Sequence, residues 1–121
     1  MSRAAKSLFF FGLYVISLGV FLVVAPNVLL KIFNVSETNE VWIRVVGVLV
    51  LIIGYYYVRA ATDKKDMSNF YRWTIYARTS VLVFFVVFVL LDFVKPALIL
   101  FGVFDFAGAV WTALALRSSE K

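Results

Sequence analysis

The 121-residue sequence contains no cysteine and no histidine. Their absence excludes disulfides and thiol chemistry, and it removes the usual protein ligands of zinc, haem iron and iron–sulfur clusters. It also removes the side chain that most often acts as a general acid or base near neutral pH. We therefore predict no catalytic residue, no metal site and no cofactor held by this chain, so that a redox cofactor would have to come from a partner.

Charged residues are also scarce. They make up 16% of the chain against 64% apolar residues, and the mean hydropathy is +0.97. A soluble domain has about 25% charged residues, whereas one helix that crosses a bilayer needs about 20 apolar residues. Four stretches reach that length, at about residues 7–25, 41–61, 73–93 and 96–116. We predict a single all-α transmembrane domain over residues 1–121, an integral membrane four-helix bundle built from two hairpins.

The first apolar stretch begins like a signal peptide, with the basic segment "MSRAAKSLFFFGLYV". Its apolar run is long and no A-x-A cleavage site follows, so we expect a retained helix. Pro26 ends or kinks that helix and leaves "NVLLKIF" as a short amphipathic piece. The segment "VKPALILFGV" in the second hairpin faintly repeats this arrangement. Two explanations are open, a duplicated hairpin or chance similarity between apolar sequences.

Lysine and arginine are distributed unevenly between the two sides of the predicted bundle. One side carries Arg3, Lys6, Arg59, Lys64, Lys65, Arg72, Arg117 and Lys121. The other side has Lys31 and Lys95, with Arg44 just inside the second apolar stretch. The positive-inside rule then predicts an N-in/C-in topology with both termini cytoplasmic. Topology and attraction to anionic lipid account for the net charge of +5, so we expect the lipid bilayer and no nucleic acid as a partner.

All six glycines fall within the apolar stretches, at Gly12, Gly19, Gly47, Gly54, Gly102 and Gly108. The first four form two pairs with seven-residue spacing, which returns to nearly the same side of a helix. Because small residues let helix backbones approach closely, we predict that the glycines mark helix-packing faces. The third stretch has no glycine, and its bulky "VLVFFVVFVLL" favours contact with lipid or with a second protomer.

Asp105 is the single charged residue in "LILFGVFDFAGAVWTALAL". On a helix, the small residues Gly102, Gly108, Ala109 and Thr112 fall on the same side as this carboxylate. The side chain should therefore point into the bundle. A charge near the middle of a membrane costs several kcal/mol, at about 3 or more on insertion scales, so it needs a partner, water or a proton.

Two arginines are candidates for that partner, since Arg44 and Arg78 each lie about one side-chain length from Asp105 in height. Arg78 and Asp92 also share one face of the third stretch. The most economical arrangement pairs Arg44 with Asp92 and Arg78 with Asp105, although the two assignments could be exchanged. Such pairs would either set the helix register or form a polar site for a ligand or ion. Arg44 could instead extend outward or pair with Glu40.

The proline-ended opening segment "APNVLLKIF", the helix start "IRVVGVLVLIIGYYY" and two further spans resemble the DoxX-like group of small bacterial four-helix membrane proteins. The resemblance covers the whole chain at the level of layout. It implies a bacterial inner membrane location and an accessory or ligand-binding role, because members have been linked to quinone-coupled oxidation as small subunits and to stress responses. It carries over no site residue.

These patterns favour a non-enzymatic small integral membrane protein that acts as an accessory subunit or binds an apolar ligand, a quinone or a lipid, within the bundle. Asp105, Arg78 and Tyr76 would be the polar anchors of that site. We also expect a homodimer or a larger membrane complex, because four helices alone form a small core.

The alternative is a small oligomeric transporter or channel that uses Asp105 with Arg78 or Arg44. Small drug exporters need an acidic residue in their first helix, and the first stretch of this chain has none, which weighs against transport. An enzyme is the least favoured class, because the chain lacks histidine, cysteine and a carboxylate pair at working spacing.

Overall fold

The computed structural model describes residues 1–39 and 41–120, with side chains through residue 118. The described residues form the helices α1 (Arg3–Val24), α2 (Pro26–Ile32), α3 (Trp42–Ala61), α4 (Ser68–Leu90), the 3₁₀ helix η1 (Pro96–Leu98) and α5 (Ile99–Glu120). The predicted all-α class is confirmed, and four helices are long and apolar enough to cross a membrane: α1, α3, α4 and the continuous η1–α5 unit.

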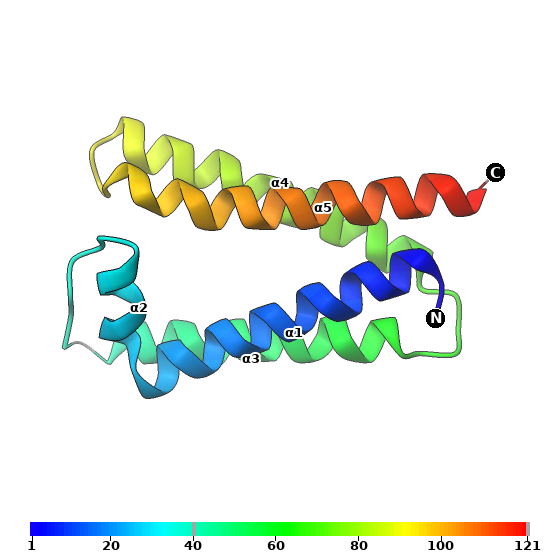
Figure 1. Ribbon diagram of the computed structural model, residues 1–121, viewed down its shortest axis with the longest axis horizontal. Coiled ribbons are helices and arrows are strands. Elements are labelled where there is room, and N and C mark those ends of the chain that lie inside the picture. Colours follow the sequence, from blue (N-terminus) through cyan, green and yellow to red (C-terminus); the bar gives the residue numbers. More distant parts are fainter. Residues whose placement is uncertain (40, 121) are drawn as a thin grey trace.

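The long helices form two antiparallel hairpins, α1–α3 and α4–α5 (Figure 1). Both chain ends and the α3–α4 loop lie at one end of the molecule, which we call the termini end (Figure 1). The short helix α2 and the α4–α5 turn lie at the opposite end, which we call the α2 end (Figure 1). A hydrogen bond of 3.1 Å from Arg3 Nη1 to Ser118 Oγ joins the two chain ends.

Local chemistry sets the boundaries of the first two helices. The Ser2 hydroxyl caps α1 by accepting a hydrogen bond from the Ala5 amide at 3.1 Å. Pro26 has no amide hydrogen to continue α1, but it fits the first turn of α2, where that hydrogen would be unused. Asn34 ends α2 in the left-handed conformation at φ 54°, and the Val35 amide bonds back to the Leu30 carbonyl at 2.8 Å. The predicted short amphipathic piece is therefore α2.

The first hairpin is held together by two facing glycine stripes. A Cβ atom built on Gly19 would lie 2.7 Å from the Leu51 backbone nitrogen, and one on Gly47 would lie 2.8 Å from Leu22 Cβ. Likewise, a Cβ on Gly12 would meet Val58 at 2.9 Å, and one on Gly54 would meet Ile16 at 2.7 Å. These separations are too short for any side chain, so the α1 and α3 backbones pack in direct contact.

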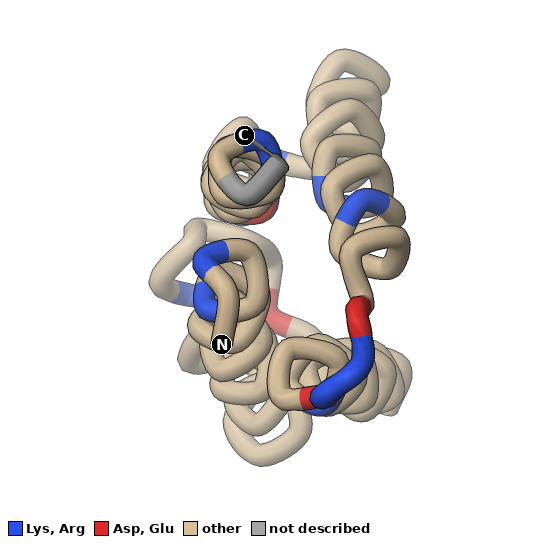
Figure 2. Tube along the Cα trace, turned by 90° about the vertical axis from the view of Figure 1, so that its right-hand side faces the viewer, with Lys and Arg blue, Asp and Glu red and all other residues tan. Residues whose placement is uncertain are grey.

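The two hairpins join mainly at the termini end. Small residues allow this approach, and the core cluster there consists of Ala4, Ala5, Leu8, Ala60, Ala61, Tyr71, Ala115 and Leu116. α4 buries only residues from its first half, namely Tyr71, Thr74 and Arg78. Viewed from the termini end, α1 lies between α3 and α5, and the α3–α4 loop crosses the remaining side (Figure 2). α3 and α4 contact each other near the termini end, where the Tyr71 hydroxyl donates to the Ala60 carbonyl at 3.1 Å. Their backbones do not pack against each other along the rest of their length, so the hairpins diverge toward the α2 end.

Candidate functional site

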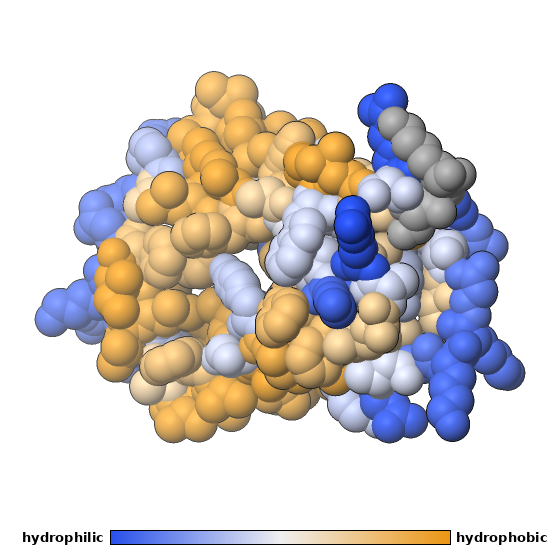
Figure 3. Space-filling view, turned by 45° about the vertical axis from the view of Figure 1, so that its right-hand side comes forward, coloured by the Kyte–Doolittle hydropathy of each residue, from blue (hydrophilic) through white to orange (hydrophobic). Residues whose placement is uncertain are grey.

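A cavity of about 430 Å³ lies between the diverging hairpins. Figure 3 shows a hollow between the two halves of the molecule, within the mainly apolar middle of the surface. Most residues that line the cavity are aliphatic or aromatic. The polar exceptions come one from each long helix: Tyr14 of α1, Tyr57 of α3, Arg78 of α4 and Asp105 of α5. This combination of apolar walls and a few convergent polar groups is typical of small-molecule sites.

Arg78 is the most buried of these polar residues, with 2% of its surface exposed. Its Nη2 atom donates to Thr112 Oγ1 at 2.9 Å and to Thr74 Oγ1 at 3.0 Å, while Nε donates to the Thr74 carbonyl at 3.2 Å. Thr112 Oγ1 also shares a hydrogen bond of 2.8 Å with Ser7 Oγ. Hydroxyl groups from α1, α4 and α5 therefore hold the guanidinium in one orientation.

Aromatic rings cover the other sides of the guanidinium. Its central carbon lies 4.8 Å from the centre of the Phe11 ring and 5.9 Å from that of Tyr57. Such cation–π contacts stabilise a desolvated charge by about 2 kcal/mol. The Nη1 atom of Arg78 is buried and has no hydrogen-bond partner in the described part of the chain. An unused buried donor costs about 1–3 kcal/mol, and native proteins usually satisfy such a group with water or a ligand.

Asp105 lines the same cavity, but the expected ion pair with Arg78 is not formed. The Nε and Nη2 atoms of Arg78 bond to threonine oxygens, and Nη1 bonds to none of the described residues. The guanidinium lies beside Gly108, where an added Cβ would be 3.2 Å from Nη1. Asp105 precedes Gly108 by three residues, which is about 4.5 Å along the helix axis toward the α2 end. The two charges therefore face one cavity without direct contact.

The sequence patterns did not indicate the two tyrosines of the site. Within residues 1–39 and 41–118, neither the Tyr14 nor the Tyr57 hydroxyl has a hydrogen-bond partner. Both rings pack against Phe11, with centroid separations of 5.5 Å for Tyr14 and 6.1 Å for Tyr57. One signal was available, because Tyr57 follows Gly54 by less than one turn and so lies toward the packing side of α3.

Tyr76, which the sequence indicated as a polar anchor, is not part of the cavity. It is 71% exposed on the outer face of α4. Two residues separate it from Arg78, a rotation of about 200° around the helix, so the two side chains leave α4 in opposite directions. This assignment was wrong because the position of Tyr76 along the helix axis matched that of Arg78, while the helix face did not.

Arg44 forms neither of its predicted ion pairs with Asp92 or Asp105. Its Nη1 atom donates to the carbonyl of Val23 and, at 3.4 Å, to that of Val24. These are the last carbonyls of α1, which lack amide partners because the helix stops before Pro26. Arg44 therefore links α3 to the end of α1, and its suggested partner Glu40 lies outside the described residues.

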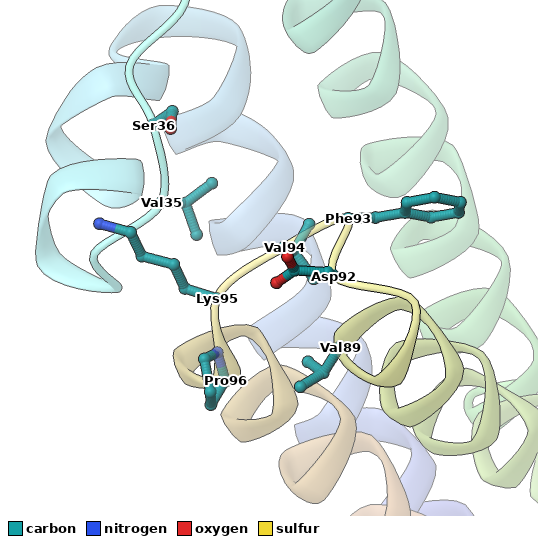
Figure 4. Close-up of a pocket in the computed structure, with 8 residues that line it drawn as sticks. All are labelled: Val35, Ser36, Val89, Asp92, Phe93, Val94, Lys95 and Pro96. Atoms are coloured by element: carbon teal, nitrogen blue, oxygen red, sulfur yellow. The ribbon is translucent and has the colours of Figure 1, made fainter.

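Asp92 lies beyond α4, so the prediction that this helix continues to Phe93 was wrong. Asp92 adopts the left-handed conformation at φ 62°, and the Phe93 amide bonds back to the Phe88 carbonyl at 2.9 Å. This arrangement closes the C-terminus of a helix. Asp92 and Lys95 border a second cavity of about 390 Å³, between the segment after α2 and the α4–α5 turn (Figure 4). Both side chains are exposed there, unlike Arg78.

No protein-family model, curated protein or solved structure matches this chain. Among the described residues, no group of three or more acidic residues could hold a metal ion. The cavity between the hairpins is therefore the candidate site, and its chemistry is that of binding: apolar walls, one cation, one carboxylate and two phenols.

Proposed function

We propose that this chain is a non-enzymatic integral membrane protein that binds an apolar ligand, such as a quinone or a lipid, in the cavity between its hairpins. One observation carries the proposal: the cavity of about 430 Å³ has apolar walls and receives one polar group from each long helix. Ligand pockets typically measure about 300–1,000 Å³ and use a few polar groups to orient a mainly apolar ligand.

The proposal includes insertion in a bacterial inner membrane with both termini in the cytoplasm. Apolar residues occupy the middle of the surface and hydrophilic residues gather toward its ends (Figure 3). Basic residues lie near both chain ends and the α3–α4 loop (Figure 2), as the positive-inside rule expects of a cytoplasmic side. An accessory role in a larger membrane complex, as the DoxX-like layout implies, fits the wide apolar face of α4.

Transport is the second candidate, because Asp105 faces a cavity and could bind a passing cation. Arg78 opposes this reading, since its fixed positive charge lies against the same cavity and would repel a cation. Binding of a neutral or amphipathic ligand does not require a cation to pass the positive charge of Arg78.

The test compares two matched tryptophan variants on α3. Val46 and Val48 are each 46% exposed, but only Val46 lines the cavity. We expect native mass spectrometry of the protein in mild detergent, after incubation with decylubiquinone and a bacterial lipid extract, to show a one-to-one adduct with the wild type. Val46→Trp should remove it and Val48→Trp should retain it. A wild type without an adduct, or equal adducts in both variants, would contradict binding in this cavity.

A further inference from the structure

The polar end of the cavity constrains what a ligand head group can be. Asp105 is the sole acidic residue within the four candidate spans, and Arg78 is the sole basic residue that lines the cavity. We propose that the cavity selects a neutral, single-chain or single-ring amphiphile whose head group carries both a hydrogen-bond acceptor and a donor, and that this head group sits between Arg78 and Asp105. The inference rests on the proposed function and specifies its ligand class.

Charge balance favours a neutral head group. A buried guanidinium stays protonated, and the carboxylate of Asp105 provides the compensating charge across the cavity. A neutral ligand leaves this balance unchanged. An anionic or cationic head group would add one uncompensated charge to a low-dielectric site, which is costly without its own partner.

Hydrogen bonding requires the head group to be dipolar. Nη1 of Arg78 is a donor without a partner among the described residues, so it needs an acceptor oxygen such as a carbonyl or hydroxyl. An ionised carboxylate only accepts hydrogen bonds, so Asp105 needs a donor such as a hydroxyl. The two groups are offset by about one helical turn, or roughly 5 Å along the axis, which leaves space for a small head group between them.

The remaining walls indicate where the apolar part of the ligand lies. Toward the α2 end, the cavity is lined by side chains without polar groups, including Leu22, Leu29, Leu30, Ile43, Leu98 and Phe101. A volume of about 430 Å³ lies near the lower limit of ligand pockets. It suits one acyl chain or one substituted ring rather than a two-chain phospholipid.

The same geometry provides an entry route from the lipid phase. The α3 and α4 backbones do not pack against each other beyond the termini end, and the cavity reaches both helices through Ile53 on α3 and through Ala77 and Val81 on α4. Ile53 and Ala77 are exposed. An amphiphile dissolved in the bilayer can therefore enter sideways between the hairpins, with no water-filled path.

Three probes with the same ten-carbon chain test the inference: monodecanoylglycerol, decanoic acid and decylamine. At about pH 8 the glyceride is neutral, the acid is an anion and the amine is a cation. Each is titrated against the full chain in phosphatidylcholine nanodiscs, and the adduct is quantified by native mass spectrometry. Adducts that persist in Val46→Trp lie outside the cavity and are subtracted. We expect the wild type to bind monodecanoylglycerol about tenfold more tightly than either charged probe.

Charge variants then shift the preference in opposite directions. Asp105→Asn leaves a net positive site, so decanoic acid should gain about tenfold relative to the glyceride. Arg78→Gln leaves a net negative site, so decylamine should gain instead. Tyr76→Phe changes no charge and lies outside the cavity, so it should keep the wild-type order. If Arg78→Gln fails to fold, the near-isosteric Asp105→Asn and the control Tyr76→Phe still decide the question.

The possible failures are distinguishable. Tighter wild-type binding of decanoic acid or decylamine than of the glyceride would overturn the head-group inference while leaving a ligand cavity in place. An unchanged preference in Asp105→Asn would also overturn it, because the carboxylate would then not contribute to selection. If none of the three probes gives an adduct that Val46→Trp removes, the proposed ligand-binding function fails as well.

Discussion

Arg78 on α4 is tied to Thr112 on α5 by a hydrogen bond of 2.9 Å, from Nη2 to Oγ1. Thr112 is fully buried and also shares a 2.8 Å hydrogen bond with Ser7 on α1. The Thr112 hydroxyl group thus connects the two hairpins, and it fixes the position of Arg78, the one charged side chain that is buried in the described structure. The orientation of the Arg78 guanidinium toward the cavity therefore depends on Thr112.

Thr112→Val should therefore destabilise the protein by about 1–3 kcal/mol, because it strands buried partners while keeping the side-chain shape. Thr79→Val is the control, since Thr79 lies on α4 outside this network. Chemical unfolding in detergent micelles measures both. Equal stability of the two variants would show that the network has no energetic role.

Arg78→Gln should destabilise more than Asp105→Asn, because the Arg78 side chain bonds to Thr74 and Thr112, whereas the Asp105 carboxylate forms no hydrogen bond or ion pair with the described residues. A double-mutant cycle should then give a coupling energy well below the roughly 3–5 kcal/mol lost when one partner of a buried ion pair is removed. Unfolding of the wild type, the two single variants and the double variant measures it. A coupling energy in that higher range would mean that the two charges meet directly.

Gly19→Ala and Gly47→Ala should each lower stability by about 1–3 kcal/mol, because the added methyl group meets rigid backbone. At Gly19 the nearest atom is the Leu51 nitrogen at 2.7 Å, and at Gly47 the Val23 nitrogen lies at 2.9 Å. Val83→Leu adds one carbon at an exposed position on α4 and should change little. Thermal unfolding followed by size-exclusion chromatography checks the series, and equal tolerance at all three sites would place the glycine stripes against lipid.

Arg44→Gln should loosen the end of α1, because the carbonyls of Val23 and Val24 lose a charged donor. A hydrogen bond to a charged group contributes about 1.5–3 kcal/mol. Hydrogen–deuterium exchange should accelerate in α2 and the last turn of α1, while the exposed control Arg59→Gln should leave this segment unchanged. Identical exchange in both variants would contradict a capping role.

Single cysteines test the proposed topology, because the chain has none of its own. Lys65→Cys lies in the α3–α4 loop and Glu37→Cys lies at the α2 end, and both positions are exposed. In intact cells, an impermeant maleimide should label the cysteine at position 37 and leave the one at position 65 unlabelled. The opposite labelling pattern would reverse the orientation.

The length of the apolar runs predicted the four helices, the chemistry of proline predicted the break at Pro26, and residue spacing predicted the glycine faces, because each of these follows from one segment alone. Residue spacing also predicted that Asp105 shares a face with Gly108 and Thr112, which a single helix determines. For the same reason, the sequence placed Arg78 and Asp105 at comparable depth, and the structure brings both to one cavity.

Tertiary structure decided which groups meet, because spacing within a helix does not set its rotation and axial shift relative to its neighbours. Arg78 meets hydroxyls rather than a carboxylate since α5 presents Thr112 to the guanidinium, while Asp105 lies about one turn farther along α5, beyond Gly108. Arg44 reaches the end of α1 since the glycine stripes bring α1 and α3 into backbone contact. The cavity exists because small residues join the two hairpins at the termini end, while the hairpins diverge toward the α2 end. No single segment encodes this separation of the hairpins.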